Sequence, residues 1–334
     1  MRRNKIIKTA GAVTAAVSAG AGLLFAEKNL IFHFGLEKAG DALNRYWKKH
    51  NNTPEFAREL IREGCKWLDT QDVKDVTVTS FDGLTLKGHF LSNPQAERLL
   101  ICFHGYRSTA YYDFGALARF LYESGCSLLL AEQRGHRISD GRYVSMGILE
   151  RRDVVTWAEY ANEIVAAQTE GFAPGDLLPI YLFGISMGAA TVLMSLDQKL
   201  PSNTAGVIAD CGYSNTYEEV RYFGSHFGIP FSKLKMPWIN RICMKKGGYS
   251  LKDANPIDAL QKAQIPVLFF HGTADELVPV QNGYDNYEAC ASPKKLVIVE
   301  GAEHAHSCFM ARERYEREML DFFERTEVSG QTEE

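Results

Sequence analysis

The sequence predicts an α/β fold with one mostly parallel sheet of about eight strands and helices on both faces. Two observations lead to this prediction: a hairpin pattern opens the domain, and short apolar runs then alternate with longer helical patterns. Such alternation places parallel strands side by side, because each helix carries the chain back across the sheet. With 334 residues, 46% hydrophobic and 23% charged, the chain is long enough for one large domain with additions.

Residues 1–26 have the pattern of a secretory signal or a membrane anchor. Four basic residues lie within Met1–Lys8, and the uncharged run Thr9–Ala26 follows them. The basic flank favours a cytoplasmic N-terminus, so we expect the chain to be membrane-anchored or secreted, with its main domain outside the cytoplasm. The alternative is an amphipathic helix packed on a cytoplasmic domain. The seven cysteines have no zinc-ligand spacing, and we expect them to be small buried hydrophobic residues. Free cysteines favour a reducing compartment such as the cytoplasm, which supports this alternative.

The rest of the chain divides into three parts. Residues 27–70 are expected to form a helical linker, with a helix start at Asn52-Thr53-Pro54-Glu55, where a capping residue precedes Pro and Glu. Residues 71–326 are expected to form the main domain, and residues 327–334 a polar, frayed tail.

The main domain opens with a hairpin, because valines alternate along Val73–Thr79 and Asp82-Gly83 supplies the turn into Leu84–Leu91. Six further strands are expected at the apolar runs Arg98–Phe103, Ser127–Ala131, Leu178–Phe183, Ala205–Ala209, Pro266–Phe270 and Leu296–Val299. Helices are expected at Tyr111–Glu123, Gly147–Glu170, Met187–Leu196, Val280–Ala291 and Phe309–Arg325.

Residues 213–254 interrupt the alternation after the sixth strand. An insertion at the carboxyl edge of a parallel sheet is placed to act as a lid, and the alternative is a helical excursion with a small core of its own. Its aromatic residues are candidates for substrate contact: Tyr213, Tyr217, Phe223, Phe227 and Trp238. Its basic residues either bind an anionic part of a substrate or form a solvated face: Lys233, Lys235, Arg241, Lys245 and Lys246.

Ser186 is the candidate nucleophile. It lies in Gly184-Ile185-Ser186-Met187-Gly188, directly after the fifth predicted strand. A G-x-S-x-G sequence at a strand-to-helix junction holds the serine on a turn so tight that its neighbours must be glycines, which leaves the hydroxyl exposed. Glycine-flanked serines are also common in ordinary turns, so the motif alone is weak evidence and needs partner residues.

Two later residues supply those partners. Asp275 follows the seventh predicted strand in a His-Gly-x-x-Asp turn, and His304 follows the eighth in a Gly-Ala-x-His turn. Serine needs a base to take its proton, and an acid to orient that base, which gives His304 and Asp275 these roles. His306 competes with His304, and Asp210 competes with Asp275, but the two turns favour the first pair.

Acyl transfer also needs donors for the oxyanion. The backbone N–H of Met187, which follows the nucleophile, is one candidate, and the N–H of Tyr106 in Phe103-His104-Gly105-Tyr106 is the other. The phenol of Tyr106 is an alternative substrate contact. We expect His104 to hydrogen-bond the loop rather than carry protons, and no glycine triplet of the HGGG type follows it.

Together these residues resemble the α/β-hydrolase superfamily over about Val73 to Arg325. Further matching pieces are Arg134-Gly135-His136, expected to brace its turn, and Gly147-x-x-Glu150-x-x-Asp153. The resemblance implies an α/β-hydrolase fold, with a helical lid after the sixth strand and no cofactor or metal. With its N-terminal apolar segment, the chain resembles bacterial membrane-anchored or cell-surface serine hydrolases of the esterase kind.

The activity expected from these residues is hydrolysis of carboxylic esters through an acyl-enzyme. The aromatic insertion favours a small-molecule ester with an apolar acyl or aryl group. The alternatives are a serine peptidase, acyltransferase or thioesterase on the same three residues, or a binding protein that no longer catalyses. The sequence shows no identifiable acidic or basic group for a peptide terminus. A net charge of −4 and a pI near 6.2 give no indication of nucleic-acid binding, and we expect none.

Overall fold

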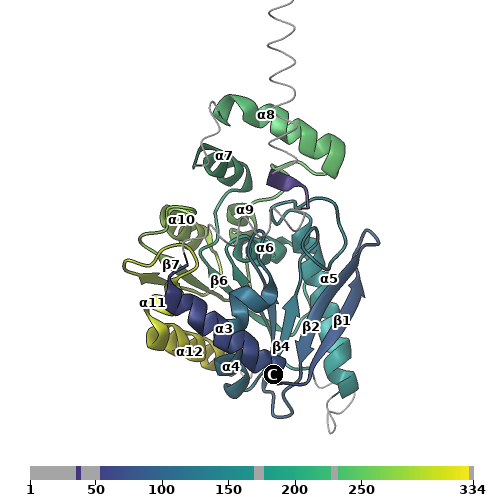
Figure 1. Ribbon diagram of the computed structural model, residues 1–334, viewed down its shortest axis with the longest axis vertical. Coiled ribbons are helices and arrows are strands. Elements are labelled where there is room, and N and C mark those ends of the chain that lie inside the picture. Colours follow the sequence, from purple (N-terminus) through teal and green to yellow (C-terminus); the bar gives the residue numbers. More distant parts are fainter. Residues whose placement is uncertain (1–34, 39–52, 169–176, 227–231, 331–334) are drawn as a thin grey trace, which may run out of the picture.

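A computed structural model describes residues 35–38, 53–168, 177–226 and 232–330 (Figure 1). Its centre is an eight-stranded sheet with the strand order β1-β2-β4-β3-β5-β6-β7-β8. Strand β2 pairs antiparallel with β1 and with β4, and the remaining neighbours are parallel. The predicted mostly parallel sheet of eight strands is therefore confirmed.

The strands are β1 (Val73–Thr79), β2 (Thr85–Leu91), β3 (Arg98–Phe103), β4 (Cys126–Ala131), β5 (Ile180–Ile185), β6 (Thr204–Asp210), β7 (Val267–Gly272) and β8 (Lys294–Val299). The α-helices are α3 (Glu55–Asp69), α4 (Ala110–Glu123), α5 (Glu150–Gln168), α6 (Met187–Met194), α7 (Thr216–His226), α8 (Ser232–Ile242), α9 (Pro256–Leu260), α10 (Gln281–Ala289), α11 (Ser307–Met310) and α12 (Arg312–Gly330). A π-helical turn, η2 (Cys243–Gly247), follows α8.

Alternate residues of the buried strands pack into two separate cores. In β3, Leu99 and Ile101 face the core that includes α5 and α6, whereas Leu100 and Cys102 face the core that includes α4 and α12. This follows from the two-residue period of a strand, and it explains why the central strands are apolar throughout. Helices therefore cover both faces of the sheet, as predicted.

Helix α3 packs on the domain, although residues 27–70 were expected to form a linker. Leu68 of α3 is fully buried in the same core as α4, and the Cys65 thiol donates to the carbonyl of Tyr111 at 3.2 Å. The helix begins within the predicted Asn52-Thr53-Pro54-Glu55, but Pro54 is its N-cap and no side chain caps it, so the expected Asn or Thr cap is wrong. The linker interpretation is wrong for this helix, because its apolar stripe is covered by α4.

The C-terminal helix also extends further than predicted. Glu327, which was expected to begin the polar tail, lies within α12. Its carboxylate accepts a hydrogen bond from the buried guanidinium of Arg98 at 2.6 Å, which ties this last part of the helix to β3. The frayed tail was therefore placed too early in the chain.

Helices α7 and α8 follow β6, where the insertion was predicted. Figure 1 shows them at the top of the molecule, beyond the helices that cover the sheet. The predicted signal or anchor segment, residues 1–26, lies outside the described residues. Within the described ranges, no helix combines the length and the apolar character needed to cross a membrane.

Candidate active site

Ser186 occupies the turn between β5 and α6, in an uncommon backbone conformation with φ 57° and ψ −118°. Such a turn brings two glycines against the backbone. A Cβ atom on Gly188 would lie 1.8 Å from the carbonyl oxygen of Phe103, and one on Gly184 would lie 2.2 Å from the carbonyl oxygen of Gly188. The glycines of the motif are therefore required by packing, and the strained turn presents the serine at the carboxyl edge of the sheet.

Substituting alanine at Gly188 is expected to destabilise the fold by about 3 kcal/mol or more, because backbone atoms must move to admit the methyl group. Denaturant unfolding of the purified variant measures this effect. Gly35→Ala is the matched control, since a Cβ atom there would have no neighbour within 4 Å among the described residues. Equal stability of the two variants would contradict the packing explanation.

Hydrogen bonds join the three candidate catalytic residues in one line. The Ser186 hydroxyl lies 2.8 Å from Nε2 of His304, and Nδ1 of His304 lies 2.7 Å from a carboxylate oxygen of Asp275. The other Asp275 oxygen accepts from the backbone N–H groups of Leu277 and Val278, at 3.0 and 2.7 Å. This arrangement fits the tautomer with the proton on Nδ1, which leaves Nε2 free to accept the serine proton.

The electrostatics of this line match its geometry. Burial by itself disfavours the Asp275 carboxylate, but His304, His271 and the hydrogen bond from the Val278 N–H lower its pKa below the ordinary value. Burial also disfavours the imidazolium of His304, but the nearby Cys211 sulfur and the Asp275 carboxylate raise its pKa above 6.5. Asp275 thus stays ionised and stabilises a proton on His304.

The two competing residues lie elsewhere. Asp210 accepts a hydrogen bond from the Tyr315 hydroxyl at 3.1 Å, and burial raises its pKa to about 6. His306 precedes the short helix α11, and burial lowers its pKa. Within the described residues, neither the Asp210 carboxylate nor the His306 ring hydrogen-bonds to the side chain of Ser186 or of His304. The geometry therefore agrees with the choice of Asp275 and His304 over both.

The predicted oxyanion loop lies against the nucleophile. A Cβ atom on Gly105 would be 3.3 Å from the Cβ of Ser186, so the loop backbone passes beside the serine. Met187 is the first residue of α6, where a backbone N–H has no partner within the helix. Tyr106 directly follows Gly105, but its phenol donates to the carbonyl of Gly35 and accepts from Arg107, an arrangement the sequence did not indicate.

Asp113 anchors this loop and was missed in the sequence. Its carboxylate accepts from the Gly105 N–H at 2.7 Å and from the Ser108 hydroxyl at 2.5 Å, and burial raises its pKa to about 6. The available signal was an acidic residue in the first turn of the helix directly after the loop. Asp113 thus positions the backbone that is expected to meet the oxyanion.

The expected scaffold histidines are neutral and fully engaged. His104 has one ring nitrogen 2.8 Å from the carbonyl of Gly105, while the other accepts from the Gln133 N–H. Burial lowers the pKa of His104 to about 4 and that of His136 to about 3. Arg134 bonds both oxygens of a buried Asp153 at 2.6 Å, which braces this turn as expected.

The candidate substrate-contact residues are dispersed. The Phe223 ring meets the Tyr106 ring edge-on, with centroids 5.8 Å apart, so α7 covers the oxyanion loop. Tyr213 is buried and donates to the carbonyl of Met146, which makes it a structural residue. Tyr217 lies under the ammonium group of Lys252, Trp238 is 52% exposed, and Phe227 lies outside the described residues. Only Phe223 is thus placed near the candidate catalytic residues by these contacts.

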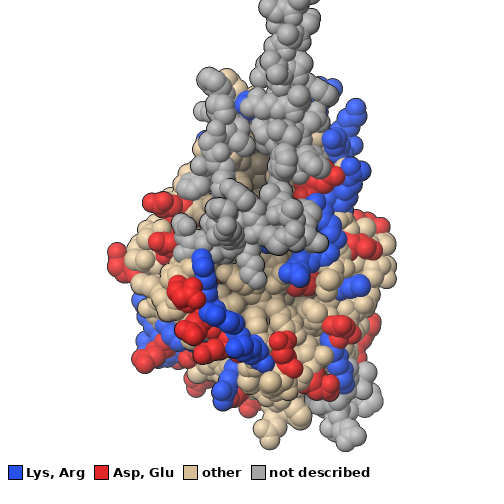
Figure 2. Space-filling view, viewed as in Figure 1, with Lys and Arg blue, Asp and Glu red and all other residues tan. Residues whose placement is uncertain are grey.

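The basic residues of the insertion also differ in their exposure to solvent. Figure 2 shows Lys and Arg side chains gathered around the position of α8 in Figure 1. Arg241, Lys245 and Lys246 are exposed, whereas Lys235 is buried. This favours a solvated face for the exposed three over contact with a substrate.

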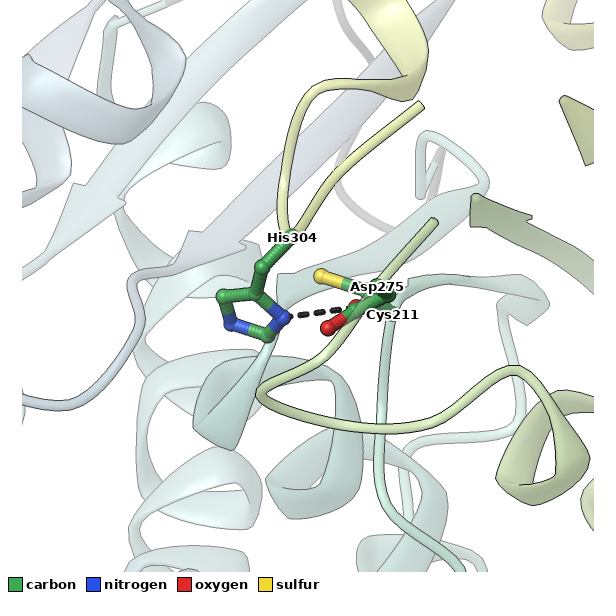
Figure 3. A group of neighbouring side chains, drawn as sticks. All are labelled: Cys211, Asp275 and His304. Atoms are coloured by element: carbon green, nitrogen blue, oxygen red, sulfur yellow. Dashed lines mark hydrogen bonds and ion pairs between the residues drawn. The ribbon is translucent and has the colours of Figure 1, made fainter. Parts of the chain in front are cut away.

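Cys211 stands beside the base and the acid, as Figure 3 shows. Its sulfur, a nitrogen of His304 and an oxygen of Asp275 all lie within 4.8 Å of one another, a spacing that could hold a metal ion. A metal on Nδ1 of His304 would displace the proton shared with Asp275. The hydrogen bond from the Ser186 hydroxyl to Nε2 of His304 instead fits proton transfer.

Three comparisons place the chain among known proteins. The family model described as "Serine aminopeptidase, S33" matches residues 94–247. The uncharacterised YqkD of Bacillus subtilis is 27% identical over 248 residues, 74% of this chain and 78% of that protein. Caffeoylshikimate esterase of Arabidopsis thaliana is 26% identical over 236 residues, 60% of this chain and 69% of that protein.

Among solved structures, the Pyrococcus furiosus esterase Pf2001 has the same fold, with a TM-score of 0.60 and 19% identity over 77% of this chain and 92% of that one. The strand order of the sheet, the position of the candidate catalytic residues after the carboxyl ends of strands, and these similarities assign the fold. The chain has the α/β-hydrolase fold, with an eight-stranded, mostly parallel sheet.

Proposed function

We propose that this chain is a serine hydrolase that cleaves carboxylic esters of small molecules through an acyl-enzyme on Ser186. The observation that carries the proposal is the continuous hydrogen-bonded line from Ser186 through His304 to Asp275. The esterases similar to this chain in sequence or fold support the choice of esters.

In the first half of the reaction, the Ser186 oxygen attacks the ester carbonyl while Nε2 of His304 takes its proton. The ionised Asp275 stabilises the imidazolium that forms. The N–H groups of Met187 and Tyr106 stabilise the oxyanion, and such a donor is worth about 3 kcal/mol of barrier. Collapse of the tetrahedral intermediate releases the alcohol, which receives the proton from His304.

In the second half, His304 takes a proton from water, and the resulting hydroxide attacks the acyl group on Ser186. A second tetrahedral intermediate forms in the same oxyanion site. Its collapse releases the carboxylic acid and returns the proton to the Ser186 oxygen. The Phe223 ring beside Tyr106 supports an apolar acyl or aryl group in the substrate.

The value of kcat/KM is expected to fall as the pH drops through the pKa of His304, because only the neutral imidazole can accept the serine proton. That pKa is raised above 6.5, so the loss should begin above pH 6.5. A pH–rate profile on a neutral ester measures it. A flat profile from about pH 5 to about pH 8 would contradict the assignment of His304 as the base.

A substrate comparison tests the reaction class. The full-length protein is assayed with an ester, a thioester and an anilide that share one short acyl group. We expect the ester to have the largest kcat/KM. A larger value for the anilide would favour a peptidase, and a larger value for the thioester would favour a thioesterase. Transfer of the acyl group to an added alcohol instead of water would favour an acyltransferase.

A further inference from the structure

Glu219 of α7 is a buried acidic residue whose carboxyl group has no hydrogen-bonding partner among the described residues. It is 6% exposed, and no hydrogen bond or ion pair to its carboxylate is found within the described part of the chain. Its neighbour Glu218 is exposed and lies 2.5 Å from the guanidinium of Arg221. Leaving a buried carboxylate ionised and unpaired is costly, so such a group either stays protonated or gains a partner.

The helix turns Glu219 toward the candidate catalytic residues. Residues three and four positions apart share one face of a helix, so Glu219 shares a face with Tyr222 and Phe223. The Tyr222 hydroxyl donates to the carbonyl of Glu276 at 2.9 Å, directly after Asp275, and the Phe223 ring contacts Tyr106. This face of α7 therefore spans the loops that hold the catalytic acid and the oxyanion donors.

Electrostatic coupling supports this placement. Burial raises the pKa of Glu219 to about 8, with His304 lowering it and the Asp275 carboxylate raising it further. The hydroxyls of Tyr213 and Tyr222 also face this charge. With a pKa of about 8, the Glu219 carboxyl is mostly protonated at neutral pH when no ligand is bound. A positively charged group beside it would favour the ionised carboxylate and form an ion pair with it.

We propose that Glu219 binds an ammonium group of the substrate, so that the preferred esters carry a cationic nitrogen near the scissile carbonyl. This rests on the proposed ester hydrolysis and specifies its substrate class. An ammonium group supplies both the charge and the N–H donors that the carboxylate lacks, which a neutral hydroxyl does only in part. Glu219 would also be an acidic group able to bind an amine terminus, which could not be identified from the sequence.

Two pairs of isosteric esters test the proposal. On the acyl side, the p-nitrophenyl ester of β-alanine is compared with p-nitrophenyl butanoate. On the alcohol side, 2-(dimethylamino)ethyl butanoate, whose protonated nitrogen carries one N–H, is compared with 3-methylbutyl butanoate. In at least one pair, kcat/KM is expected to favour the cationic ester by about 10- to 100-fold, and Glu219→Gln should remove that preference. Glu218→Gln is the matched control, because it removes an exposed charge one residue away, and it should retain the preference.

A measurement on the unmodified chain covers the case in which Glu219→Gln does not fold. Butylammonium should inhibit hydrolysis of p-nitrophenyl butanoate at a concentration at least about 10-fold lower than butan-1-ol. Equal inhibition by the two, or a cation preference that survives in folded Glu219→Gln, would overturn the role of Glu219. Absence of hydrolysis for every ester in both pairs would overturn the proposed function itself, so the two failures are distinguishable.

Discussion

Replacing Ser186 by alanine is expected to lower kcat for ester hydrolysis by about 10⁶-fold, which is typical when the nucleophile of such a site is removed. No other described hydroxyl is hydrogen-bonded to His304. The turn should survive, because its glycines stay in place and the backbone N–H of residue 186 still donates to the carbonyl of Asp210. Steady-state kinetics on a p-nitrophenyl ester measure the loss, and circular dichroism verifies the fold.

Ser195→Ala is the matched control for that variant. The Ser195 hydroxyl follows the same helix, is buried, and donates to the carbonyl of Val192 at 2.7 Å. Its loss should leave kcat close to that of the unmodified chain. Activity of folded Ser186→Ala at the level of this control would mean that the hydrolysis does not proceed through an acyl group on Ser186.

Asp275→Asn is expected to lower kcat by about 10⁴-fold, with the geometry of the site largely kept. An asparagine N–H in place of the carboxylate oxygen favours the tautomer of His304 whose proton is on Nε2, where it can no longer accept from Ser186. The change should also lower the pKa of His304, since Asp275 raises it. The acid side of the pH–rate profile should therefore move to lower pH. Kinetics over a range of pH measure both effects.

Asp210→Asn separates the two candidate acids. Asp210 is as buried as Asp275 but is hydrogen-bonded to Tyr315 and not to His304. Its substitution should leave the acid side of the pH–rate profile in place, whatever it does to stability. A larger loss of kcat in Asp210→Asn than in Asp275→Asn would assign the catalytic acid to Asp210.

The sheet and the three candidate catalytic positions could be predicted from the sequence for one physical reason. Ser186, Asp275 and His304 each follow a short apolar run, and the carboxyl ends of parallel strands meet at one edge of a sheet. The glycines on either side of Ser186 indicate a close backbone approach at the turn, and the short Cβ distances there agree with it. Local patterns thus carried most of the information about this edge.

Other features depend on contacts between distant segments, which local patterns do not encode. The amphipathic helix α3 gave no sign of which surface it covers, so its packing on α4 was mistaken for a linker. Glu327 belongs to α12 because Arg98, far away in the sequence, bonds it. Glu219 is one of several acidic residues in the insertion, and only the fold of α7 over the site distinguishes it from Glu218.

Labelling with a fluorophosphonate, followed by intact-mass measurement, tests the central claim most directly. The probe reacts with a serine only where a base activates it and an oxyanion site stabilises the adduct. We predict one adduct per chain, located on Ser186 and absent from Ser186→Ala. A folded protein that takes up no probe, or that takes it up equally in Ser186→Ala, would contradict the account of an activated Ser186.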